Sequence, residues 1–109
     1  MLEMSVRNGV LHGQRVYALQ GPLLMENVAE FLRTLREETA REVILDLSGV
    51  PRTDSSGIGA LVQILVRYRK NQQELVLSGP NGFVLAALDI TGVRSLFRVH
   101  PTLAEAQTA

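Results

Sequence analysis

Residues 51–61 read PRTDSSGIGAL and connect an apolar run to an amphipathic one. The preceding run, Val43–Leu47, is short and rich in β-formers, which predicts a buried strand. After it, apolar residues recur at helical spacing from Ile58 to about Tyr68, which predicts a helix. The quoted stretch therefore forms a loop and the first turn of a helix at the carboxyl edge of a sheet. Open α/β sheets usually place their binding sites at that edge.

The loop offers a carboxylate and two hydroxyls beside the unpaired N–H groups of a helix start, from Asp54, Ser55 and Ser56. The simplest interpretation is that Asp54 or Ser56 only caps the helix. One cap suffices for one helix, however, and Gly57 and Gly59 each lower helix propensity by roughly 1 kcal/mol. The glycines lower helix stability and leave the first turn without side chains. This combination indicates a surface on which another molecule docks.

The composition of the chain excludes several classes of protein. Its 109 residues, 46% of them hydrophobic, predict one domain over residues 1–109. The chain has no cysteine, which excludes disulfides, thiol catalysis and thiolate metal sites. With 11 basic and 11 acidic residues it has no basic stripe for nucleic acid and no polybasic segment for a membrane. The N-terminus lacks signal-peptide features and no apolar run approaches ~20 residues, so we expect a cytoplasmic protein without membrane insertion.

The residues before the central stretch predict two strands and a helix. The strands run from Met4 to about Leu11 and from Arg15 to Gln20. Asn8-Gly9 and His12-Gly13 are both plausible turns between them, and His12-Gly13 is favoured because it leaves two strands of usable length. From about Leu23 to Thr39, apolar residues at helical spacing predict a helix.

The residues after it predict two more strands and two short helices. A strand at Glu74–Ser78 precedes a short helix from Phe83 to about Ile90, and Phe97–Val99 forms a final edge strand. Thr102 and Glu105 have the capping-box spacing, which begins a short terminal helix. This order predicts an α/β fold: a mixed sheet of about five strands, the first pair antiparallel and the others parallel, with two long and two short helices.

The residues needed for catalysis are not arranged in a known pattern. His12 fits a turn, and His100 has no carboxylate pattern around it. The motif lacks the glycine of a nucleophile elbow, the third glycine of a dinucleotide fingerprint and a phosphate-binding lysine. Asp46 and Asp54 could share a metal, but Asp46 within a strand is more typical of a solvated or edge position. We expect no enzyme, no cofactor and no metal, the alternative being a weak nucleotide-binding or hydrolysing domain.

A serine at this helix start could instead be a substrate for phosphorylation. A phosphate adds about −1.5 to −2 charges and three acceptor oxygens. The helix dipole and the free N–H groups tolerate such a group, so the fold need not break. Asp54 adds like charge. A partner packed on the bare surface would then be repelled, so the geometry permits a switch that changes binding without unfolding.

The strand Val43–Leu47 followed by DSSGIGAL at residues 54–61 resembles the STAS domain of anti-sigma factor antagonists. The resemblance covers almost the whole chain and includes Val84–Val93, which is similar to the family's third helix. It implies that the unphosphorylated form captures an anti-sigma factor, often itself a serine kinase, and so frees a sigma factor. The kinase would phosphorylate the first serine of the motif, here Ser55, and a phosphatase would restore it. Ser56 would be the N-cap.

One segment departs from that family, which commonly has Gly-Glu-Leu-Asp after its second strand. Here residues 21–25 read GPLLM, so apolar residues replace the two acidic ones. The departure favours two alternatives: a non-switching scaffold domain of a signalling assembly, or the STAS subunit of a lipid-transport complex. We expect a monomer or weak dimer. The predicted partner-binding residues are Leu24, Met25, Asp54, Ser55, Ser56, Gly57, Ile58 and Gly59.

Overall fold

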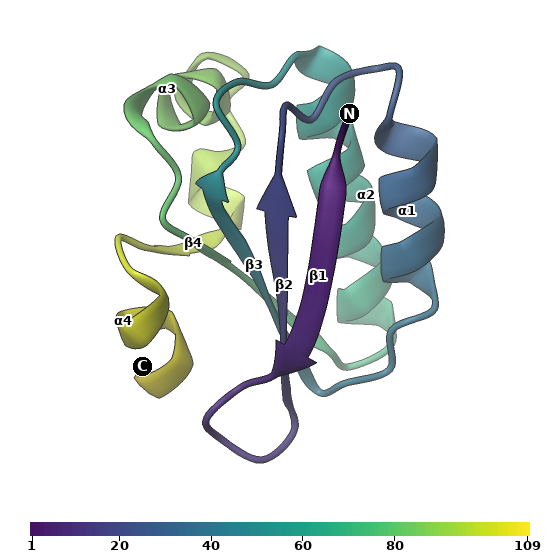
Figure 1. The fold of residues 1–109 in the computed structure, drawn as a ribbon, viewed down its shortest axis with the longest axis vertical. Helices are drawn as coiled ribbons and strands as arrows, with labels where there is room; N and C mark the ends of the chain where they lie inside the picture. Colours follow the sequence, from purple (N-terminus) through teal and green to yellow (C-terminus); the bar gives the residue numbers. More distant parts are fainter.

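The computed structural model describes residues 1–109 and contains one five-stranded sheet flanked by helices (Figure 1). The strands are β1 (Glu3–Asn8), β2 (Gln14–Gln20), β3 (Glu42–Gly49), β4 (Glu74–Ser78) and β5 (Arg98–His100). The helices are α1 (Val28–Arg36), α2 (Ser55–Lys70), α3 (Gly82–Ile90) and α4 (Leu103–Thr108), with a 3₁₀ turn at Arg94–Leu96.

The strands lie in the sheet in the order in which they occur in the chain. β1 is antiparallel to β2, and each following pair is parallel. Parallel neighbours need a crossover, which α1, α2 and α3 provide in turn. The predicted α/β class, the mixed sheet, the antiparallel first pair and the four helices are confirmed. At nine residues, α1 is shorter than expected.

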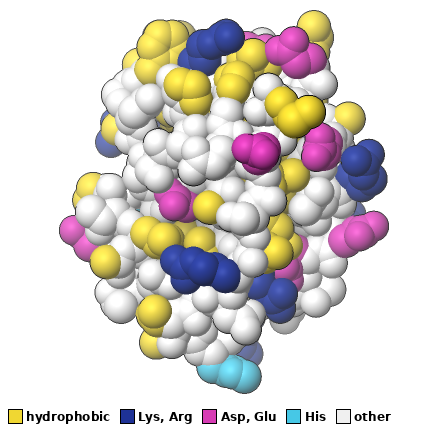
Figure 2. All heavy atoms as spheres, in the orientation of Figure 1, with side chains coloured by type: hydrophobic (Ala, Val, Ile, Leu, Met, Phe, Trp, Pro, Cys, Tyr) yellow, Lys and Arg dark blue, Asp and Glu magenta, His cyan; other side chains and the backbone are white.

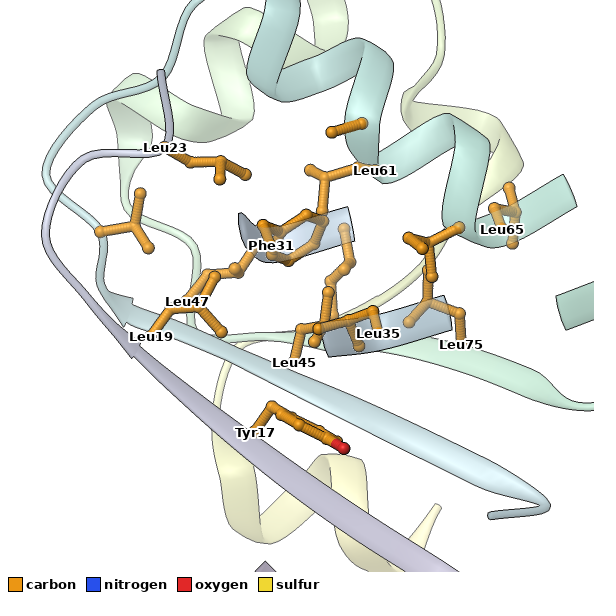
Figure 3. Packing of buried hydrophobic residues seen from close by; sticks show 14 of the residues in the cluster. Tyr17, Leu19, Leu23, Phe31, Leu35, Leu45, Leu47, Leu61, Leu65 and Leu75 are labelled. Carbon is orange, nitrogen blue, oxygen red and sulfur yellow. The ribbon is translucent and has the colours of Figure 1, made fainter. Parts of the chain in front are cut away.

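The central strand β3 is buried on both faces of the sheet. Leu45 and Leu47 face α1 and α2, where Phe31, Leu35 and Leu61 pack against them (Figure 3). On the other face, alternate residues form a smaller apolar cluster against α4, consisting of Val16, Ile44, Val76 and Ala106. In Figure 1, α1 and α2 lie on one side of the sheet and α4 lies on the other. The continuous apolar run of the sequence reflects this double burial.

The helix predicted from Leu23 to Thr39 is wrong at both ends, because α1 runs from Val28 to Arg36. Leu23 instead forms an isolated parallel bridge with Thr53. The Asn27 side chain then accepts from the Leu24 N–H at 2.9 Å and donates to the Pro22 carbonyl at 2.8 Å. Asparagine side chains close turns in this way, so residues 24–27 form a turn before the helix.

The first strand ends at Asn8, three residues before the predicted Leu11, and the connection to β2 is a wide loop. The Gly9 N–H donates to the Gln14 carbonyl at 3.1 Å, and the Gln14 N–H donates to the Leu11 carbonyl at 3.2 Å. The favoured His12-Gly13 turn therefore forms inside a larger loop. Gly13 has a φ of 86°, a backbone conformation that suits glycine.

The C-terminal part follows the prediction apart from a shift of one residue. The Thr102 hydroxyl accepts from the Glu105 N–H at 3.1 Å, which confirms the predicted start of α4. The last strand is Arg98–His100 and not Phe97–Val99, because Phe97 follows an unpredicted 3₁₀ turn and packs in the core. None of the helices has both the length and the apolar character needed to cross a membrane.

Candidate functional site

The connections after β2 and β3 meet at the carboxyl edge of the sheet. The Leu23 N–H donates to the Arg52 carbonyl at 3.2 Å, and the Thr53 hydroxyl donates to the Leu23 carbonyl at 2.7 Å. Leu23 itself is buried in the main core, at 1% exposure. These contacts hold the segment after β2 against the loop that leads to α2.

The Asp54 carboxylate joins the two segments at the start of α2. Its Oδ1 accepts from the Gly57 N–H at 2.9 Å, so Asp54 is the N-cap. Its Oδ2 accepts from the Met25 N–H at 3.0 Å. These backbone hydrogen bonds, the one from Gly57 first, hold the pKa of Asp54 below its usual range. The group therefore stays ionised at neutral pH.

The two serines follow as the first two residues of the helix. Asp54 has extended backbone angles, φ −116° and ψ −175°, as an N-cap requires, whereas Ser56 already lies within α2. The expectation that Ser56 is the N-cap is therefore wrong. Ser55 is exposed and Ser56 is half-buried. Because α2 begins at Ser55, its first N–H groups have no partner within the helix.

The two glycines of the motif have different surroundings. A Cβ at Gly57 would collide with the Thr53 hydroxyl and the Leu23 carbonyl, and Gly57 is buried. Close approach within the chain thus explains this glycine. A Cβ at Gly59 would meet nothing within 4 Å, and Gly59 is exposed. Only Gly59 leaves bare helix surface without an internal reason.

The structure divides the predicted partner-binding residues into an outer and an inner set. Met25 is 73% exposed and Leu24 is half-buried beside it. Ile58 is only 3% exposed, since it packs in the core under the first turn of α2. The sequence predicts that a partner docks at this helix start, and we use the term docking surface for its accessible residues, which are Leu24, Met25, Asp54, Ser55, Ser56 and Gly59.

One exposed apolar residue near this edge was missed by sequence reasoning. Phe83, in the first turn of α3, is 63% exposed. The Asn81 side chain that caps α3 donates to the Val50 and Pro51 carbonyls at 3.3 and 3.2 Å, which ties α3 to the loop before the motif. Figure 2 shows hydrophobic side chains gathered at the upper end of the molecule, over α3 and the carboxyl edge of the sheet. The signal available in the sequence was a phenylalanine two residues after Asn81, at the start of the predicted helix.

The two aspartates considered for a metal are engaged separately. Asp46 Oδ1 accepts from the Ser48 N–H at 3.1 Å and from its hydroxyl at 2.7 Å. Asp54 is held by Gly57 and Met25. No group of three or more histidine, aspartate or glutamate side chains is placed to hold a metal ion.

Comparison with known proteins identifies one family over nearly the full chain. The STAS domain model matches residues 1–106. The Anti-sigma-B factor antagonist of Staphylococcus aureus strain NCTC 8325 is 30% identical over 71 residues, which are 65% of this chain. That match spans 66% of the relative's length, just under two thirds.

Solved structures share the fold. An anti-sigma factor antagonist from Mycobacterium paratuberculosis superposes with a TM-score of 0.86 at 19% identity, covering 99% of this chain and 92% of the other. A sulfate transporter family protein from Wolinella succinogenes superposes with a TM-score of 0.82 at 27% identity, covering 91% and 85%. The same fold therefore occurs in an anti-sigma factor antagonist and in a sulfate transporter family protein.

Proposed function

Because this chain belongs to the STAS domain family, we propose that residues 1–109 act as one domain that antagonises an anti-sigma factor. In this proposal the unphosphorylated protein binds a serine kinase that sequesters a sigma factor, and the binding frees the sigma factor. Phosphorylation of Ser55 ends the interaction, and a phosphatase restores it. The protein is a binding switch with no catalytic residue, cofactor or nucleic-acid partner of its own.

The observation that carries this proposal is the setting of the Ser55 side chain. It is exposed, it is the first residue of α2, and its hydroxyl takes part in no hydrogen bond within the chain. In the reaction, Ser55 Oγ attacks the γ-phosphorus of ATP, the hydroxyl proton passes to a base of the kinase, and ADP leaves. The new phosphate lies by the unpaired N–H groups of the helix start, which favour an anion.

Charge explains how the phosphate would act on a bound partner. Asp54 is held ionised by its backbone hydrogen bonds, so a phosphate on Ser55 adds to an existing negative charge. Met25 and Gly59 give the docking surface an apolar side chain and a bare turn of helix on which a partner packs. A dianion in such a contact loses its water without gaining a counter-charge. The partner therefore dissociates while the fold stays intact.

The test has two steps, and Ser56 provides the matched control. Ser55→Ala and Ser56→Ala proteins serve as affinity baits. A retained protein is identified as an anti-sigma factor when its removal from a complex with a sigma factor frees that sigma factor. The parent protein and both variants are then incubated with that partner and ATP, and their peptides are mapped by mass. We expect one phosphate, on Ser55, in the parent and Ser56→Ala proteins and none in Ser55→Ala. A phosphate on Ser56 or Thr53 alone would show the assignment to be wrong.

A second candidate is supported by the apolar segment after β2. The transporter family neighbour shares the fold, and Pro22 and Leu24 stand where anti-sigma factor antagonists commonly have acidic residues. In this alternative the domain is a scaffold of a signalling assembly or the STAS subunit of a lipid-transport complex. The two functions differ in their response to charge at Ser55. Constant affinity of Ser55→Asp for the captured partner would favour the scaffold.

A further inference from the structure

The strand β1 leaves one edge of the sheet open. Five of its six residues are exposed, with only Met4 half-buried. Val6, on the face toward α1 and α2, is 53% exposed, so no element covers the edge there. Edges of this length are usually covered, twisted away or interrupted, because they pair readily with other strands.

The hydrogen bonding of the hairpin determines which backbone groups point outward from β1. Gly9 is bonded directly to Gln14, opposite it across the hairpin, through a 3.1 Å N–H to carbonyl bond. Bonded and non-bonded pairs alternate in an antiparallel ladder. The odd-numbered residues of β1 are therefore bonded to β2, and the N–H and carbonyl groups of Met4, Val6 and Asn8 point away from the sheet.

Two opposite charges on this strand take part in no ion pair, although Arg7 Nη1 donates to the neighbouring Asn8 carbonyl at 3.3 Å. Glu3 and Arg7 lie on the same face of β1, because they are four residues apart. That spacing separates them by about 13 Å along the strand, too far for an ion pair. The three ion pairs of the molecule involve other residues. The strand thus presents a negative side chain near its start and a positive one near its end.

We propose that β1 pairs antiparallel with β1 of a second copy of this chain, with Ser5 opposite Ser5. In this register Met4 lies opposite Val6 of the second copy, and their outward backbone groups form hydrogen-bonded pairs. Glu3 lies opposite Arg7 of the second copy in a non-hydrogen-bonded pair, where side chains approach most closely. Two-fold symmetry makes each pair occur twice, so the edge is complementary to itself.

Charge selects this register over its neighbours. A pairing centred on Met4 places Glu3 opposite Ser5, and one centred on Val6 places Arg7 opposite Ser5. Either shift loses both ion pairs. The Ser5-centred pairing also places the exposed Val6 against Met4 of the second copy. Both side chains are apolar and lie on the face of the sheet that α1 and α2 cover. Each copy continues the sheet of the other across the edge.

Charge reversal tests the register through sedimentation equilibrium of the full chain, from about 10 μM to about 1 mM. We expect a concentration-dependent dimer in the parent protein. Glu3→Arg alone and Arg7→Glu alone each turn two attractive pairs into two repulsive ones, and should raise the dimer dissociation constant roughly tenfold. The double variant, Glu3→Arg with Arg7→Glu, exchanges the charges and should restore the parent value.

Lys70→Glu is the matched control, since it makes the same change in net charge as Arg7→Glu on an exposed residue of α2. It should leave the dimer unchanged, and thermal melting of each variant shows that the monomer still folds. A monomer throughout the concentration range would overturn the proposal. A dimer that tolerates both single reversals, or a double variant no better than the singles, would do the same.

Discussion

At the scale of single residues, Asp54 links the two halves of the docking surface. One carboxylate oxygen caps α2 through Gly57 and the other binds the backbone of Met25. A single side chain therefore both begins the helix and holds the apolar residue beside the serine. The hydroxyl of Ser55, the residue that follows it, is exposed and makes no hydrogen bond within the chain.

The two glycines of the motif are expected to respond oppositely to alanine. Gly57→Ala forces a Cβ into the Thr53 hydroxyl and the Leu23 carbonyl and should lower the free energy of unfolding by about 1–3 kcal/mol. Gly59→Ala meets open space and should raise it by up to about 1 kcal/mol through helix propensity. Urea denaturation measures both. Equal effects of the two substitutions would contradict their assignment to an inner and an outer position.

Met25→Glu tests the apolar part of the docking surface. Met25 is 73% exposed, so the substitution should leave the melting temperature nearly unchanged. It places a charge in an apolar contact and should weaken partner binding by more than about 1 kcal/mol. Titration calorimetry with the captured partner measures this. Val10→Glu, exposed in the loop between β1 and β2, is the control, and equal affinity of the two variants would remove Met25 from the interface.

At the scale of elements, α1 and α2 are tied by a buried hydrogen bond. The Tyr68 hydroxyl of α2 donates to the Leu35 carbonyl near the end of α1 at 2.7 Å. Burial raises the pKa of Tyr68, so the hydroxyl stays protonated and remains a donor. The two crossover helices are therefore aligned at their C-terminal ends as well as by their apolar faces.

Tyr68→Phe should expose the contribution of this bond. Phenylalanine fills the same volume but leaves the Leu35 carbonyl without the hydroxyl, which should lower the free energy of unfolding by about 1–2 kcal/mol. The urea midpoint should fall with an unchanged m-value. An unchanged midpoint would mean that the hydroxyl gains as much from water in the unfolded chain as from Leu35.

Elements with a strong periodic pattern were predictable from sequence, and elements shaped by side-chain contacts were not. The apolar run of β3 and the helical spacing of α2 predicted both within a few residues. The start of α1 was misplaced because Asn27 closes a turn with Pro22 and Leu24, whose apolar side chains continue the helical pattern. In the candidate site, the order of the motif predicted the exposed Ser55. The burial of Gly57 depends on a carbonyl thirty-four residues earlier in the chain, Leu23, and could not be predicted.

At the scale of the whole molecule, one sheet carries two unequal layers. The larger core lies between the sheet and α1 with α2, and the smaller one lies under α4. β3 contributes to both, so its residues connect the layers. The motif follows this strand after a short loop, so Ser55 lies at the carboxyl end of the central strand of the sheet.

Leu45→Asp tests the central position of β3. Leu45 is fully buried, so the carboxylate would be placed without a partner and should cost several kcal/mol, enough to unfold a domain of ordinary stability. Far-ultraviolet circular dichroism during heating measures the loss. Val66→Asp, on an exposed position of α2, should melt close to the parent. A folded Leu45→Asp protein with an unchanged melting temperature would contradict the placement of this strand.

The most direct test of the switch is the affinity of Ser55→Asp for the protein retained by Ser55→Ala, measured by titration calorimetry. The added carboxylate lies next to the ionised Asp54 on the docking surface. We predict at least roughly tenfold weaker binding than that of the parent, with a nearly unchanged melting temperature because the charge faces a helix N-terminus. Equal affinity of the parent and Ser55→Asp proteins, both folded, would contradict the account of Ser55 as the switch.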